Sequence, residues 1–199
     1  MSGDVHVRFC ERLGGRVPGA TRLVVAFQYR DEANAFYRAL PSRLKQFNLD
    51  VTAGKTSLKR FSRFHPGQER SFEFLGFRFY WDVDFGGGPR LRRKTAPKKH
   101  KSLLQALYTW IKENRHKRLN RLMPMLKRKL DGIGNYFALP DNSLSVSRIY
   151  GHVLHSLYKW LNRRSQKRSF NWGGLKEMLR YYRIQPLTVR KRAVPADWY

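Results

Sequence analysis

The sequence predicts an α+β fold, in which a βαββ segment over residues 1–88 precedes a basic bundle of three or four helices. In the first segment, β-branched and aromatic residues form short runs between turn residues, as in strands. From about residue 90, apolar residues instead recur at spacings of three and four, as on one face of a helix. Hydrophobic residues make up 41% of the 199 residues, which is enough for a buried core and excludes a disordered basic tail.

The first segment opens with a predicted strand and helix. Leu23–Phe27 is a continuous apolar run, which predicts a buried strand. Asp31 is expected to cap the following helix, whose apolar stripe extends from Ala33 to Phe47. Pro41 lies inside this stripe and is expected to kink or split the helix, because proline cannot donate a backbone hydrogen bond.

Two further runs of strand character complete the first segment. Leu49–Phe61 predicts a turn and a strand, and Ser71–Trp81 predicts a single strand rich in aromatic residues. Gly86–Pro89 then predicts the turn of a hairpin between two flanking strands.

The helices are expected in residues 89–185. Leu103–Ile111 marks a first helix. Leu126–Phe137 marks a second, which is expected to begin near Pro124, because proline is tolerated in a first turn.

A break and two more helices follow. Pro140–Ser143 predicts the break, with capping residues, and Val146–Leu161 carries the clearest helical period of the chain. Asn171 is expected to cap a last short helix. Residues 186–199 have no period and are expected to form a surface tail.

The charge of the chain is strongly positive and unevenly placed. The sequence has 41 Lys and Arg against 14 Asp and Glu, a formal net charge of +27. Residues 88–170 hold 21 of the basic residues and only 3 of the acidic ones. A solvated helix surface normally mixes the two signs, so this imbalance favours a surface that binds a polyanion, with nucleic acid as the first candidate.

Several other classes of protein are excluded. One cysteine, Cys10, excludes a disulfide scaffold and any multi-cysteine metal site. Met1–Val7 lacks the pattern of a signal peptide, and no stretch approaches the roughly 18 apolar residues of a membrane span. We therefore expect a cytoplasmic protein that has no membrane partner.

No catalytic, metal or cofactor site is predicted. His152 and His155 are three residues apart on the best helix, but no carboxylate or cysteine accompanies them on that face. Asp82 and Asp84 are better explained as the solvated end of a hairpin than as paired catalytic carboxylates.

Aromatic residues are interleaved with the basic ones. Core packing is expected for Trp110, Phe137, Tyr150 and Trp160, because they recur at helical spacing. One or two of the larger set are expected to stack on unpaired bases instead. That set is Tyr108, Trp110, Tyr136, Phe137, Tyr150, Tyr158, Trp160 and Trp172.

The order of several motifs resembles the C-terminal part of group II intron reverse transcriptases. Phe47–Thr56 resembles their FGLELxPEKT stretch, and Phe72–Phe79 resembles the FDFLGFxF strand at the end of the polymerase palm. Arg92–Thr95 is similar to the start of their thumb. Gly134–Ser143 resembles the NYYxVPGNS turn of the maturase region, and Tyr158–Arg168 its WxxxLxRRSQ helix. The resemblance implies a partial palm followed by a helical thumb and maturase domain.

The sequence departs from this family at the polymerase centre. The family carries a YADD tetrapeptide before the strand that Leu23–Gln28 resembles, whereas Gly19–Arg22 stands at that place here. A shifted alignment places Arg8–Arg12 on the motif and supplies a single carboxylate, Glu11. Two-metal phosphoryl transfer needs carboxylates that hold both ions, so the chain is not expected to be a polymerase on its own.

The resemblance implies a maturase-type protein that binds structured group II intron RNA and assists its splicing. Two alternatives stay open: a thumb subunit that works with a separately encoded fingers–palm fragment, and a decayed, truncated fragment. The residues expected to bind RNA are basic and lie in three groups along the chain. They are Arg92, Arg93, Lys94, Lys98, Lys99 and Lys101; Lys112, Arg115, Lys117, Arg118, Lys127, Arg128 and Lys129; and Arg163, Arg164, Lys167 and Arg168.

Overall fold

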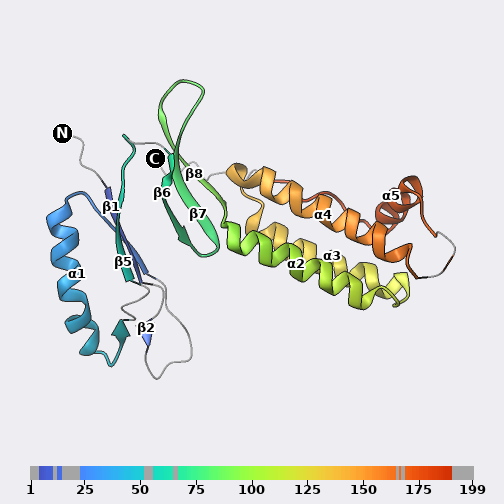
Figure 1. Cartoon of the computed structure of the whole chain (residues 1–199), viewed down its shortest axis with the longest axis horizontal. Coiled ribbons are helices and arrows are strands. Elements are labelled where there is room, and N and C mark those ends of the chain that lie inside the picture. The colour runs from blue at the N-terminus through green and yellow to red at the C-terminus, as the bar shows by residue number, and fades with distance from the viewer. Residues whose placement is uncertain are drawn as a thin grey trace, which may run out of the picture. The chain divides into compact units, whose positions relative to one another are not determined.

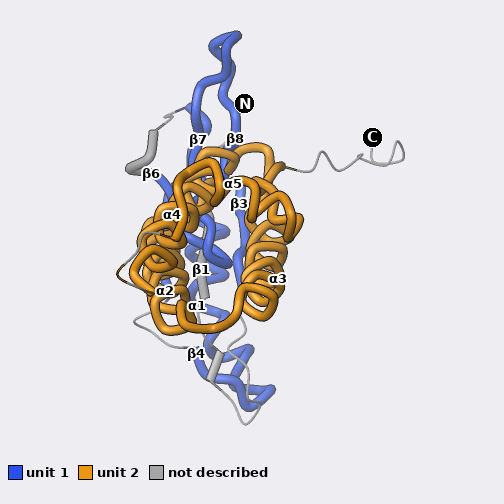
Figure 2. The backbone as a smooth tube through the Cα atoms, turned by 90° about the vertical axis from the view of Figure 1, so that its right-hand side faces the viewer, with its two compact units in different colours: residues 1–93 blue, residues 94–199 orange. Residues whose placement is uncertain are grey.

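The computed structural model contains two compact units, residues 1–93 and residues 94–199 (Figure 2). It describes residues 5–10, 13–14, 23–51, 56–64, 67–164, 166 and 169–189, with the backbone alone at 5–10, 13–14 and 67–69. Within the described residues, unit 1 consists of strands and one helix, whereas unit 2 begins with the last two residues of a strand and then contains helices and their connections. This mixture of helix and sheet agrees with the predicted α+β class.

A three-stranded antiparallel sheet forms the first layer of unit 1 (Figure 1). Its central strand is β1 (Val5–Cys10), which pairs with β3 (Leu23–Phe27) on one side and β5 (Thr56–Phe61) on the other. The predicted strand at Leu23–Phe27 is therefore confirmed. A short second pairing joins β2 (Leu13–Gly14) to β4 (Asp50–Val51).

The helix α1 (Arg30–Lys45) packs on this sheet and differs from the prediction at two residues. Tyr29, not Asp31, precedes the first turn, and its side chain makes no capping hydrogen bond. Asp31 lies inside the first turn, where its charge favours the helix dipole. The helix also continues through Pro41, so the predicted split is wrong, while a kink at Pro41 stays a prediction; the buried Leu40 anchors the helix next to the proline.

The predicted single strand over Ser71–Trp81 is wrong, because the chain reverses in the middle of it. The strands β6 (Gly67–Phe74) and β7 (Phe77–Val83) pair with Phe74 opposite Phe77. Leu75 and Gly76 form the turn with φ values of 48° and 78°, as in the primed turns that suit hairpins. On one face of the hairpin, the Phe72 and Phe79 rings stack at 5.0 Å.

The predicted hairpin around Gly86–Pro89 is confirmed, and it joins β7 to β8 (Pro89–Thr95). The Asp84 carboxylate accepts hydrogen bonds from the backbone N–H groups of Gly86 and Gly88, both at 2.9 Å. Gly87 has a φ of 79°, which favours glycine at this position.

Unit 2 contains the four predicted helices (Figure 1). They are α2 (Pro97–Asn114), α3 (Leu119–Phe137), α4 (Ser143–Leu161) and α5 (Trp172–Tyr181), with a single 3₁₀ turn η2 (Pro140–Asn142) before α4. One apolar cluster joins all four helices. Among the described helices, none has the length and apolar character needed to cross a membrane.

The start of α3 lies five residues earlier than predicted, at Leu119 instead of Pro124. Leu122 and Met123 are fully buried, so the core stabilises a turn that precedes the proline. Pro124 is therefore inside the helix, near its beginning.

Asn142 is the N-cap residue of α4, but its side chain makes no capping hydrogen bond there and instead holds the turn between α3 and α4. Its Oδ1 accepts a hydrogen bond from the Thr95 backbone N–H at 2.8 Å. Its Nδ2 donates to Thr95 Oγ1 at 2.8 Å and to the Phe137 carbonyl at 2.9 Å. By contrast, the predicted cap at Asn171 is confirmed, since its side chain accepts from the Gly174 N–H at 2.7 Å.

Candidate nucleic-acid interface

Four cationic side chains surround the indole ring of Trp160, and they come from α2, from α4 and from the residues just after these two helices. The Arg115 Cζ lies 5.1 Å from the ring centroid and the Arg163 Cζ 5.6 Å. The Nζ atoms of Lys159 and Lys112 lie 5.4 Å and 5.7 Å from it. These distances are those of cation–π contacts. We call the five residues the Trp160 cluster.

Helix geometry explains why these residues meet. Lys112 lies in the last turn of α2 and Arg115 directly follows that helix; Lys159 lies in the last turn of α4 and Arg163 two residues beyond its end. Each pair is therefore at the C-terminal end of its helix. The two helices pack against each other (Figure 2). Trp160 is only 8% exposed, which places its ring between the core and the cations.

Tyr108 of α2 supports the same arrangement. Its ring meets Trp160 edge to face at 5.7 Å. The Lys159 Nζ donates a hydrogen bond to the Tyr108 hydroxyl at 3.0 Å, and this contact lowers the pKa of Tyr108. The tyrosine thereby orients Lys159 without neutralising it.

The cations of the cluster have no acidic partner within the described part of the chain, since none of the ion pairs there includes Lys112, Arg115, Lys159 or Arg163. Other predicted residues differ in this respect. Lys127 pairs with Asp131 at 2.7 Å and Arg92 with Asp82 at 3.2 Å. Four like charges held around one ring repel each other, so an anion that binds among them relieves that repulsion.

The first predicted group does not gather at the cluster. Arg92, Arg93 and Lys94 are half-buried on β8, not in a helix. The other three are exposed in the first turns of α2, which contain no acidic residue. They are Lys98, Lys99 and Lys101.

The remaining predicted residues lie in several environments. Lys129 lies over the Trp110 ring at 5.1 Å, and Arg118 and Arg128 are exposed. The Arg164 Nη2 donates to the Lys117 carbonyl at 2.8 Å, and burial lowers the pKa of Arg164. This arginine therefore joins the segment after α4 to the connection between α2 and α3. Lys167 and Arg168 lie outside the described residues.

The aromatic residues interleaved with the basic ones differ in their exposure to solvent. Core burial is confirmed for Phe137 and Trp160, whereas Trp110 and Tyr150 are half-buried. In the larger aromatic set, Tyr136 and Trp172 are the exposed members. Sequence reasoning missed Lys159 and Tyr108 as parts of the site. The spacing of Lys159 to Arg163 around Trp160 is the signal that identifies the first of them.

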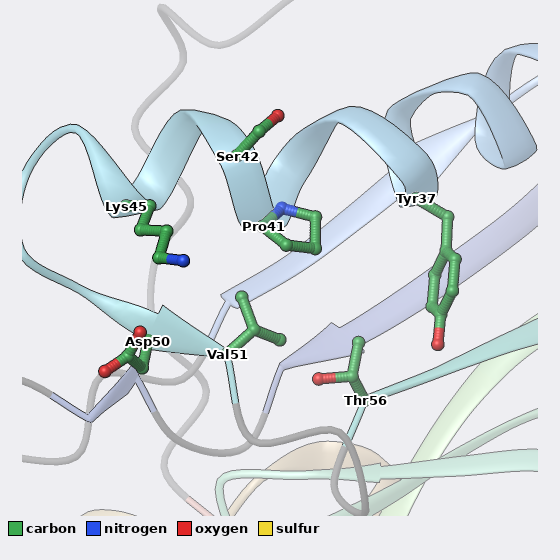
Figure 3. A pocket seen from close by; sticks show the side chains of 7 residues that line it. All are labelled: Tyr37, Pro41, Ser42, Lys45, Asp50, Val51 and Thr56. Carbon is green, nitrogen blue, oxygen red and sulfur yellow. The ribbon is translucent and has the colours of Figure 1, made fainter.

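Neither a metal site nor the pocket beside α1 adds a second candidate site for RNA. Among the described residues, no three His, Cys, Asp or Glu side chains come close enough to hold a metal ion. A pocket of about 510 Å³ lies between α1 and the strands β4 and β5, lined by Tyr37, Pro41, Ser42, Lys45, Asp50, Val51 and Thr56 (Figure 3). None of the predicted RNA-binding residues lines it.

Comparison with known families identifies the helical unit. The family model of the group II intron, maturase-specific domain matches residues 100–179, which extend from α2 into α5. No curated protein matches the chain. The family match supports a maturase-type role in intron splicing and confirms the resemblance that the maturase motifs indicate. Residues 100–179 are thus similar to the maturase-specific domain of group II introns.

Proposed function

We propose that this protein binds structured group II intron RNA through the Trp160 cluster and so assists intron splicing. The observation that supports this proposal is the gathering of four cations around one indole without an acidic partner in the described chain. The cluster lies within residues 100–179, the part that matches the maturase-specific domain. Phosphate groups suit such a site, because each RNA phosphate that a lysine or arginine neutralises releases counterions condensed on the RNA.

In this proposal the intron RNA carries out the chemistry and the protein contributes charge and shape. The exposed Lys98, Lys99 and Lys101 extend the positive surface at the beginning of α2. Lys112 and Arg115 hold phosphates nearer its end. We also propose that the chain has no polymerase activity of its own, because its sequence lacks the paired aspartates that two-metal transfer needs.

The test compares two variants that lose the same charge. In the first, Lys112, Arg115, Lys159 and Arg163 are all replaced by Gln. In the second, four exposed cations of α1 are replaced by Gln instead; these are Arg30, Arg38, Arg43 and Lys45. Binding of a group II intron RNA is measured against salt concentration for both variants and for the unchanged chain.

The first variant should flatten the log–log salt dependence by about 3, because each lost phosphate contact removes roughly 0.7 to 0.9 from the slope. The α1 variant should keep nearly the full slope, although its net charge is the same. Equal flattening in both variants would show that binding depends on net charge and not on the Trp160 cluster.

Specificity needs a second comparison, since charge alone attracts any RNA. The unchanged chain should bind the intron RNA more tightly than a structured RNA of equal length at physiological salt. It should also accelerate splicing of that intron, and the four-Gln variant of the cluster should not. Equal affinity for the two RNAs would contradict a maturase function.

A further inference from the structure

Tyr158 on α4 and Trp172 at the start of α5 form a stacked pair of rings. Their centroids are 4.2 Å apart and their planes differ by 6°. Trp172 remains 40% exposed, although Tyr158 covers part of its ring and the His155 ring meets it edge to face at 5.3 Å. Parallel rings that stay accessible offer a surface on which another flat ring can stack. We call this pair the stacking platform.

Hydrogen bonds from two asparagines fix the platform before any ligand arrives. The Asn162 Oδ1 accepts from the N–H groups of Ser169 and Phe170, and its Nδ2 donates to the Phe170 carbonyl. Asn171 then caps α5 by accepting from the Gly174 N–H. The end of α4 is thereby tied to the start of α5, so a ligand that stacks on Trp172 has little ordering cost to offset.

The charges around the platform indicate which ligand it fits. Tyr158 directly precedes Lys159, a member of the Trp160 cluster, so the two sites adjoin on α4, about 100° apart around the helix axis. Lys176 follows Trp172 by one helical turn and is exposed. Cations that flank an accessible aromatic ring match a nucleotide, whose base stacks while its phosphates are neutralised.

We propose that the stacking platform binds an unpaired nucleobase of the RNA whose phosphates the Trp160 cluster neutralises. This inference rests on the proposed function and adds a preference for single-stranded segments. A base inside an A-form helix is stacked between its neighbours, so only a loop, bulge or end offers its face to Trp172.

The test measures affinity for two probes, a single-stranded decauridylate and an RNA duplex of ten base pairs. Replacing Trp172→Ala should weaken decauridylate binding by about fivefold to 150-fold, the equivalent of one stacked base, and change duplex binding by less than about twofold. Trp172→Phe keeps a ring and should bind decauridylate within a few-fold of the unchanged chain. Tyr181→Ala removes another exposed ring of α5, outside the platform, and serves as the matched control.

Tryptophan fluorescence provides a second test of the stacking platform that does not depend on the destabilising substitution Trp172→Ala. Decauridylate should quench tryptophan emission of the unchanged chain, and Trp172→Phe should remove part of that quenching while it retains binding. The platform is refuted if quenching is the same in Trp172→Phe, or if Trp172→Ala weakens both probes equally or neither. If the platform is refuted but the chain still binds the duplex in a salt-dependent way, the proposed RNA-binding function stands. If the chain binds neither probe, the platform and the proposed function are both refuted.

Discussion

Replacing Asn142 by Ala should strongly destabilise the helical unit, although this residue lies outside the proposed RNA-binding surface. Asn142 is 1% exposed and makes three hydrogen bonds, two with Thr95 and one with the Phe137 carbonyl. These bonds connect the first residues of unit 2 to the turn between α3 and α4.

The size of the effect follows from the partners left behind. Each of the three bonds contributes about 1 kcal/mol net, which gives about 3 kcal/mol in total. The Thr95 N–H becomes a buried donor without an acceptor, which adds to the cost. The Phe137 carbonyl is less affected, because it still accepts from the Leu139 N–H at 2.8 Å. For a unit of this size, about 3 kcal/mol corresponds to a fall in melting temperature of about 12 °C.

The assay is thermal and urea unfolding followed by circular dichroism at a helical wavelength, which reports mainly on α2 to α5. Asn135→Ala is the matched control, because Asn135 is an exposed asparagine of α3. Thr95→Val removes one of the three bonds and should cost about a third as much. If Asn142→Ala costs less than about 1 kcal/mol, or no more than Asn135→Ala, the hydrogen-bond argument is wrong.

Three further predictions concern charge, pH and activity. The melting temperature of the helical unit should rise from low to physiological salt, because salt screens the repulsion among its basic residues; thermal melts that are insensitive to salt would contradict this. Burial lowers the pKa of His152 below its ordinary value of 6.5, so the unfolded chain binds a proton that the folded chain resists. Stability measured by urea unfolding should therefore fall as pH decreases from 7.5 to 5.5, and fall less in His152→Gln. Primer extension by the purified chain on an RNA template with magnesium should yield no cDNA, and templated product would refute the proposed lack of polymerase activity.

The helical half of the fold could be predicted well from sequence, because its signals are local. The apolar period of each helix is visible within a window of ten to twenty residues. The start of α3 was misplaced because Pro124 suggested a helix beginning, whereas burial of Leu122 and Met123 determined it. The hydrogen bonds of Asn142 are equally hard to predict from the break at Pro140–Ser143, because one of its two partners, Thr95, is 47 residues away.

The sheet half could be predicted less completely. Ser71–Trp81 alternates in the way a long strand does, and the single sign of its turn is Gly76. The central position of β1 has no local signal, because it depends on pairing both with β3 and with β5, and β5 follows only after the helix α1. Pairing over such distances is decided by the whole sheet and not by any one window of sequence.

The site was predicted as a set of cations but not as a location. Lys112, Arg115 and Arg163 were in that set, yet only the packing of α2 against α4 brings them to one ring. A cation that pairs across two strands, as Arg92 does with Asp82, looks the same in the sequence as an unpaired one. A spacing of three or four residues shows which cations lie close together along one helix, but it does not show which helices face each other.

Trp160 allows positive charge to accumulate without being cancelled. An acidic neighbour stabilises a lysine by removing its field, as Asp131 does for Lys127. The face of an indole attracts a cation by about 0.5 to 1 kcal/mol at an exposed site, but carries no net charge of its own. The attraction to the ring therefore offsets part of the repulsion among the four cations. Their full positive charge remains available to bind phosphate. This is why the aromatic residue at the centre of the cluster, and not only the cations, matters to the proposed function.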